Sequence, residues 1–120
     1  MSEVLEIAKE IKAKIRQLED GRNFLQRAAE LKAESSAKYE KEVAKWLIRL
    51  KNGEEVTFEG HTVKNPPTTI VYHIVKGLCW ELALDRDKNE SLYKSTVEKL
   101  ECLRAELNGW QSINRFLSET

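Results

Sequence analysis

Residues 4–50 read VLEIAKEIKAKIRQLEDGRNFLQRAAELKAESSAKYEKEVAKWLIRL, and this segment decides the fold. A seven-residue repeat of mostly apolar side chains runs through it in a single phase. The first position holds Val4, Ile11, Leu18, Leu25, Lys32, Tyr39 and Trp46, and the second, four residues later, holds Ala8, Ile15, Arg22, Ala29, Ser36, Val43 and Leu50. A repeat kept in register this long needs a partner helix along its length. We therefore predict one helix over about residues 2–51.

Gly21 is the weak point of this predicted helix, because glycine costs about 1 kcal/mol in a helix interior. The repeat nevertheless keeps its phase across it, since Leu18 and Leu25 are seven residues apart. A loop at Gly21 would normally shift that phase. We therefore expect the helix to continue through Gly21 and to end at Asn52-Gly53, where the glycine can take the left-handed cap conformation.

The second half of the chain supplies the partner helix. Its apolar seam comprises Val75, Cys79, Leu82, Arg86, Asn89, Tyr93, Thr96, Leu100, Leu103, Leu107, Trp110, Asn114 and Leu117. Residues 85–91 are polar but contain neither Gly nor Pro, so they give no reason for a break. The sequence predicts one continuous helix over about residues 69–117, capped by Thr68 or Thr69.

The tip between the helices, over about residues 53–67, changes character. Residues 56–58 and 62–63 are strand formers on either side of Glu59-Gly60, which predicts a short β-hairpin. A lone two-stranded hairpin is only marginally stable in water. It must therefore pack on the helix ends or pair with another copy. Asn65-Pro66-Pro67 ends the extended segment.

The predicted fold is all-α: a single domain over residues 1–120 that forms a long antiparallel helical hairpin, or coiled coil, with a β-hairpin-like tip. Folding about residue 60 pairs residue i with about residue 119 − i. This rule places Tyr39 near Trp80 and Lys32 opposite Asp87. We expect the Lys32–Asp87 pair to fix the register more than to add stability.

A further group of apolar residues lies beside or off the two seams. They are Ile7, Leu31, Leu47, Ile48, Leu78, Leu84, Leu92, Val97 and Ile113. Two helices alone bury only one stripe each, so a widened apolar face favours another layer. The simplest such layer is a second copy, which gives a homodimeric four-helix bundle.

The composition is that of a helix-rich soluble protein, with 33% charged and 41% hydrophobic residues and only two prolines. No apolar run approaches the roughly 20 residues of a membrane span, and the acidic N-terminus is unlike a secretory signal. Cys79 and Cys102 would lie about 35 Å apart along a helix, too far for a disulfide. We expect both to be small buried side chains of a cytoplasmic protein.

No motif in the chain indicates an enzyme, a cofactor or a metal site. Phosphate-binding loops, nucleophile elbows and paired-cysteine motifs do not occur. Two polar sets come closest to metal sites: His61, His73 and Cys79, and Asp85, Asp87, Asn89 and Glu90. The first matches no zinc spacing, and the second has Glu90 where a calcium loop requires glycine. We expect no catalytic residues, no cofactor and no metal.

Aromatic side chains suggest where a partner could bind. Those at helical spacing, namely Tyr39, Trp46, Trp80, Tyr93 and Trp110, are interpreted as core residues. The tip gathers a different set: Phe58, His61, Lys64, Tyr72, His73 and Lys76. Surface aromatics beside a few charges are typical of a recognition site. The alternative is a tip that packs on itself and closes the hairpin, and the sequence leaves both open.

The second half also carries a resemblance to known proteins. Its matching segments are Lys76-Gly77, Leu82, Arg86-Asp87, Leu92-Tyr93-Lys94, Leu103-Arg104-Ala105-Glu106-Leu107 and Gln111-Ser112. With the helix from Ala29 to Leu50, they resemble short coiled-coil proteins encoded by phages and prophages of Gram-positive bacteria. The resemblance covers about residues 29–117, whereas residues 1–28 and 53–67 depart from it. It implies a small helical protein that binds a host protein, such as a defence or replication component.

These observations predict a non-enzymatic protein that inhibits or redirects a host protein by occlusion, in the host cytoplasm. The alternative is a nucleic-acid-binding accessory protein. That alternative would use the basic positions of the first helix: Lys9, Lys12, Arg16, Arg27, Lys38, Lys41, Lys45 and Arg49. Glutamates interleave these positions, which weakens a phosphate-binding face, and the chain as a whole has no net charge.

Overall fold

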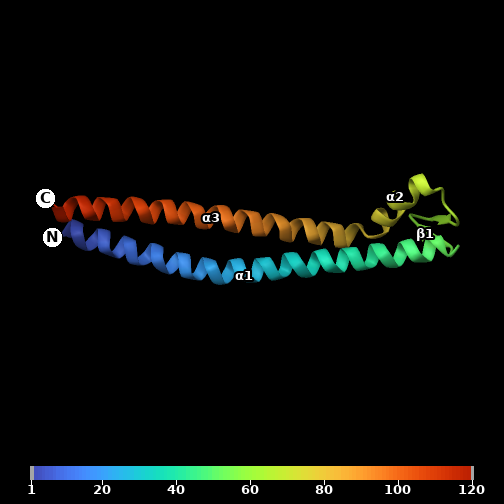
Figure 1. Ribbon diagram of the computed structural model, residues 1–120, viewed down its shortest axis with the longest axis horizontal. Coiled ribbons are helices and arrows are strands. Elements are labelled where there is room, and N and C mark those ends of the chain that lie inside the picture. The colour runs from blue at the N-terminus through green and yellow to red at the C-terminus, as the bar shows by residue number, and fades with distance from the viewer. Residues whose placement is uncertain (1, 120) are drawn as a thin grey trace. The chain divides into compact units, whose positions relative to one another are not determined.

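The computed structural model describes residues 2–119 and confirms the predicted fold class. Its elements in chain order are helix α1 (Ser2–Lys51), strands β1 (Val56–Phe58) and β2 (His61–Val63), helix α2 (Thr68–Leu78) and helix α3 (Trp80–Glu119) (Figure 1). α1 has the predicted bounds and runs without interruption through Gly21. The two strands form the short antiparallel hairpin expected of the tip.

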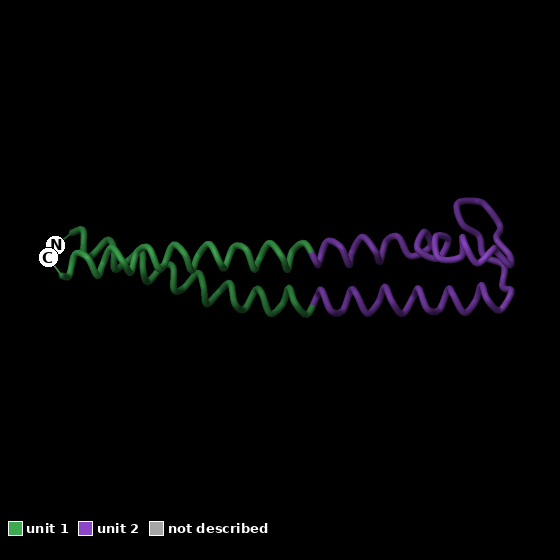
Figure 2. Tube along the Cα trace, turned by 45° about the horizontal axis from the view of Figure 1, so that its top comes forward, with its two compact units in different colours: residues 1–30, 91–120 green, residues 31–90 purple. Residues whose placement is uncertain are grey.

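The chain divides into two compact units (Figure 2). Unit 1 comprises residues 1–30 and 91–120, and unit 2 comprises residues 31–90. In each unit a segment of α1 lies beside a segment of α3 and runs in the opposite direction. Unit 2 also contains the β-hairpin and α2.

In unit 1, α3 uses the predicted seam, since Thr96, Leu100 and Leu103 are buried. The seam of α1 differs from the prediction in its second stripe. Its buried or half-buried residues are Ile7, Ile11, Lys14, Leu18, Gly21, Leu25, Ala28 and Ala29. The predicted Val4, Ala8, Ile15 and Arg22 are exposed, and of the predicted second stripe only Ala29 is half-buried. The true stripe lies one residue earlier in each repeat.

Small and flexible side chains explain this shift. A Cβ built on Gly21 would overlap Cδ2 of Leu100, so α3 packs directly against the α1 backbone there. Ala28 is buried one repeat further along. Lys14 sits at the edge of the seam, where its Nζ lies 2.6 Å from Oε2 of Glu106. Neither Gly21 nor Lys14 has an apolar side chain that would mark it in the sequence. The apolar repeat therefore places Ile15 in the seam instead.

Unit 2 has its own hydrophobic core at the tip. Its buried residues are Leu50, Val56, Val71, Val75 and Cys79, with Tyr39, Val43, Trp46, Leu47, Ile74 and Leu78 packed around them. Gly53 has a φ of 82° and ends α1 as predicted. Glu59 and Gly60, with φ of 49° and 78°, form the hairpin turn. The hairpin therefore gains its stability from α2 and the end of α1.

The predicted continuous second helix is wrong at Cys79, which separates α2 from α3. Gly77, two residues before the break, is the local signal for it in the sequence. Cys79 and Val75 are both buried in the unit 2 core, so the break lies where α2 packs on the rest of the unit. α3 is continuous through residues 85–91, as predicted. Pro67 occupies the N-cap of α2, and the predicted caps Thr68 and Thr69 are its first helical residues.

The rule that pairs residue i with residue 119 − i holds in unit 1, where Lys14 contacts Glu106. In unit 2 it is wrong, because the guanidinium of Arg86 lies 4.2 Å from the ring centroid of Tyr39, where the rule places Trp80. Trp80 instead lines a hollow together with Trp46. The β-hairpin and α2 fold back over the end of α1, so α3 begins opposite Trp46.

Candidate partner-binding surface

The outward face of α2 holds three of the six residues predicted at the tip. Val71 and Val75, one helical turn apart, are buried and fix the inner face of α2 in the unit 2 core. Tyr72, His73 and Lys76 are all exposed, and 52% of Tyr72 is accessible. Lys76 is three and four residues from the other two, so the three side chains share one helix face. We call this set the α2 face.

Phe58 does not join the α2 face. It is half-buried, and its ring lies against Gly77, where a Cβ would come within 2.7 Å of Cζ and 3.2 Å of Cε2. His61 is paired directly with Phe58 across the hairpin and is exposed, as is Lys64 just after β2. Phe58 therefore packs within the tip, as predicted by the alternative in which the tip packs on itself. Tyr72 on α2 is exposed to solvent.

Trp80 is an exposed aromatic that the sequence interpretation treats as core. It is 56% accessible and lines a hollow with Trp46, Cys79, Glu42 and Glu81. The position of Trp80 in the seven-residue repeat could have indicated that it is exposed. The seam passes through Cys79 and Leu82, so the intervening Trp80 lies beside the seam rather than in it.

One edge of the tip is organised by Arg49. Its guanidinium lies 4.2 Å from the Trp46 ring centroid and donates hydrogen bonds of 3.0 and 3.1 Å to the carboxylate of Glu54. These hydrogen bonds lower the pKa of Glu54 and raise that of Arg49. Both groups are exposed, so the pair orients side chains more than it stabilises the fold.

The basic positions of α1 do not form a uniform cationic surface. Arg27 pairs with Glu30, Lys45 with Glu42, and Arg49 with Glu54. A phosphate backbone would have to compete with these carboxylates. The geometry therefore gives the nucleic-acid alternative little support.

The Lys32–Asp87 register pair stays a prediction. Asp87 accepts a 3.1 Å hydrogen bond from Nε of Arg86, whose guanidinium also lies over Tyr39. These contacts raise the pKa of Arg86, chiefly through the hydrogen bond with Asp87. Arg86 thus gives Asp87 a partner on its own helix.

The two cysteines differ, and the expectation that both are buried is wrong for Cys102. Cys79 is buried, which raises the pKa of its thiol, whereas Cys102 is exposed on α3. Across residues 2–119, no three His, Cys, Asp or Glu side chains are placed to hold a metal ion together. No helix in the same range is both long and apolar enough to span a membrane.

No protein-family model matches this chain, and no curated protein or solved structure matches it either. The resemblance to phage coiled-coil proteins therefore stays a prediction.

Proposed function

We propose that this chain is a non-enzymatic protein that binds another protein through the α2 face and acts by occlusion. The observation that carries the proposal is the exposure of Tyr72, with His73 and Lys76 beside it, on a helix whose opposite side is anchored by Val71 and Val75. An aromatic side chain held on a rigid support loses little entropy on binding. Tyrosine is accordingly enriched among the residues that dominate protein interfaces.

The resemblance supplies the setting of the proposal. In a phage context the partner is a host protein, for example a defence or replication component, which the chain inhibits or redirects in the host cytoplasm. The chain acts as a homodimer, so that each particle carries two α2 faces. Occlusion requires no catalytic group, because a bound helix blocks a surface by its volume alone.

The test compares capture by immobilised wild-type protein with capture by two variants in an extract of a Gram-positive host. Tyr72→Ala removes the centre of the α2 face. Ile48→Ala removes an apolar side chain of α1 that is 61% accessible, against 52% for Tyr72, and is the matched control. We expect one protein to be retained by wild type and by Ile48→Ala, and lost by Tyr72→Ala.

The captured protein is then purified and its affinity measured by calorimetry. Tyr72→Ala should weaken the affinity by at least about 10-fold, as expected of an interface hot spot. Equal affinity of wild type and Tyr72→Ala would overturn the α2 face as the binding surface. Capture of nucleic acid alone, with affinity that falls steeply with salt, would instead establish the nucleic-acid alternative.

A further inference from the structure

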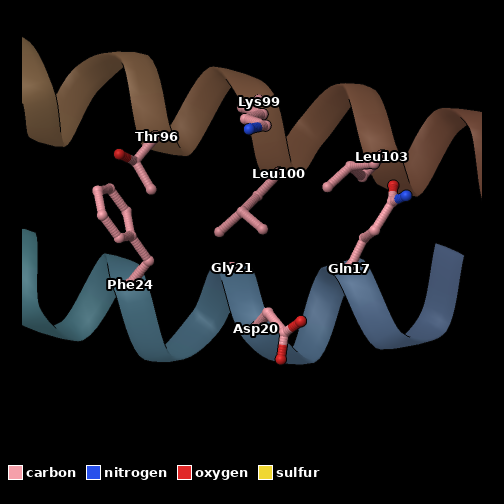
Figure 3. A pocket seen from close by; sticks show the side chains of 8 residues that line it. All are labelled: Gln17, Asp20, Gly21, Phe24, Thr96, Lys99, Leu100 and Leu103. Carbon is pink, nitrogen blue, oxygen red and sulfur yellow. The ribbon is translucent and has the colours of Figure 1, made fainter. Parts of the chain in front are cut away.

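A groove opens along one side of unit 1. Its first hollow has a floor of Gly21, Leu100 and Leu103, with Phe24, Asp20 and Lys99 at the rim (Figure 3). Its second hollow is lined by apolar Ile7, Trp110, Ile113 and Leu117, with Glu3 and Glu10 beside them.

The two hollows lie on the same side of the helix pair. On α1, Glu3 and Glu10 of the second hollow are each a multiple of seven residues from Phe24 of the first. On α3, Trp110 of the second hollow is seven residues from Leu103 of the first. Residues seven apart share one face of a coiled-coil helix, so the hollows form one surface, which we call the unit 1 groove.

Apolar side chains are open to solvent in the unit 1 groove. Phe24 is 53% accessible and Ile113 is 47% accessible. Figure 3 shows the Phe24 ring and Thr96 directed toward each other from the two helices. The exposure of Phe24 gains nothing for an isolated hairpin, because burying a Phe side chain is worth about 1.5–3 kcal/mol.

The solvent-accessible surface area of the chain is large enough to include a protein–protein interface. The chain exposes 8911 Å², whereas a compact monomer of its 13.9 kDa mass exposes about 6,700 Å². The excess of roughly 2,200 Å² exceeds the ~800 Å² per partner that a standard stable interface buries. A second helical layer over unit 1 would remove part of this excess.

The charged residues at the rim of the first hollow favour a second copy of the chain as the occupant of the groove. Asp20 on α1 and Lys99 on α3 lie on opposite rims of the same hollow. A twofold axis parallel to the unit 1 helices places α1 of one copy over α3 of the other at the same level. Asp20 of each copy then faces Lys99 of the other. Every helix also becomes antiparallel to both of its neighbours, which aligns their dipoles favourably.

We propose that the unit 1 groove is the homodimer interface, occupied by the same groove of a second copy. Phe24 is buried at its centre, and two symmetric Asp20–Lys99 pairs close its rims. The inference completes the homodimer of the proposed function, but its test is independent of partner binding. Failure of the dimer leaves the capture result on the α2 face untouched, and the reverse also holds.

The test is sedimentation equilibrium of two charge variants, alone and mixed. Asp20→Lys alone turns both rim pairs into Lys–Lys repulsions, and Lys99→Glu alone turns both into repulsions between carboxylates. Each should raise the dimer dissociation constant at least about 10-fold. In an equimolar mixture, each introduced charge meets its opposite across the interface, so heterodimers should form with near wild-type affinity.

Mixing leaves the charges within each chain unchanged, so restored association can come only from contacts between chains. The apolar part of the interface is tested with Phe24→Ser, which should weaken the dimer at least about 10-fold. Ile15→Ser is its control, because Ile15 is also exposed but is nine residues away, on the opposite side of α1.

Three outcomes would overturn the proposal. They are a wild-type protein that stays monomeric at the highest concentrations, a mixture of charge variants that fails to associate, and an Ile15→Ser variant that loses the dimer as fully as Phe24→Ser. A wild-type protein that stays monomeric and binds a helix of another protein in the groove would also overturn the proposal.

Discussion

The side chain of Leu100 on α3 occupies the space that a β-carbon on Gly21 of α1 would need. Its Cγ lies 3.4 Å from that position, and its Cδ2 overlaps it. Leu100 is buried with Leu18 and Leu103 in the core of unit 1. The glycine that reads in the sequence as a weak point of α1 is therefore a position at which the Leu100 side chain packs directly on the α1 backbone.

This contact predicts opposite effects for the same substitution at two helical glycines. Gly109 lies exposed in α3 with nothing near it, so Gly109→Ala should stabilise the protein by about 0.5–1 kcal/mol. Gly21→Ala gains the same propensity but overpacks Leu100, which typically costs about 1–3 kcal/mol. Urea unfolding should show Gly21→Ala to be less stable than wild type. Equal stabilisation by both substitutions would refute the contact.

A second close contact involves Phe58 and Gly77 at the tip. Gly77→Ala should destabilise unit 2 by about 1–3 kcal/mol, because the added methyl meets a stiff aromatic ring. Thermal unfolding monitored by circular dichroism measures this effect. Lys76→Ala, at the neighbouring exposed position, is the control and should change the melting temperature little. A neutral Gly77→Ala would mean that Phe58 does not close the tip.

The Arg86–Tyr39 contact should contribute about 0.5–2 kcal/mol, as a partly buried cation–π pair does. Arg86→Ala should lower the free energy of unfolding by that amount. In a Tyr39→Leu background, the same substitution should cost less, because the ring has gone. The exposed neighbour Lys88→Ala serves as the control. Identical losses in both backgrounds would show that Arg86 acts through another contact.

The Arg49–Glu54 pair predicts a dependence of stability on pH. The folded-state pKa of Glu54 lies below its ordinary value of 4.5, so its contribution is present above that pH and is lost as the pH falls through the folded-state pKa. Wild type should be more stable than Glu54→Gln near pH 7, and the difference should vanish in strong acid. Glu55→Gln is the matched control. A gap that persists in strong acid would contradict an ionic origin.

Thiol reactivity separates the two cysteines. Cys102 is exposed and should react with an aromatic disulfide reagent within minutes at pH 8. Cys79 is buried and has a raised thiol pKa, so it should react only after the tip opens. Cys102→Ser should therefore abolish the fast phase and Cys79→Ser should leave it intact. A fast phase that survives Cys102→Ser would place Cys79 at the surface.

Periodicity predicts those parts of the fold where apolar side chains mark the contact. The α3 seam could be predicted because Leu100 and Leu103 are buried leucines in phase with the rest. The second stripe of α1 could not, because Gly21 contacts α3 through its lack of a side chain. Ile15, which fits the pattern, stays exposed.

The tip shows the same limit. Val56–Phe58 and the turn at Gly60 follow local preferences, and the predicted hairpin is confirmed. The break at Cys79 follows Gly77 by two residues, and Cys79 is buried in the unit 2 core, but the apolar repeat runs through it and so gives no sign of it. In the sequence, Tyr72 and Phe58 are both aromatic residues of the tip. Only the packing of Phe58 on Gly77 shows that Phe58 packs within the tip, whereas Tyr72 is exposed.

The most direct measurement for the central claim is site-specific photocrosslinking in an extract of a Gram-positive host. Benzoylphenylalanine is placed at Tyr72 on the α2 face or, as the control, at Ile48. The proposed function predicts one discrete adduct from position 72 and none from position 48. An adduct from Ile48 alone, or no adduct from either position, would contradict the α2 face as the site of partner binding.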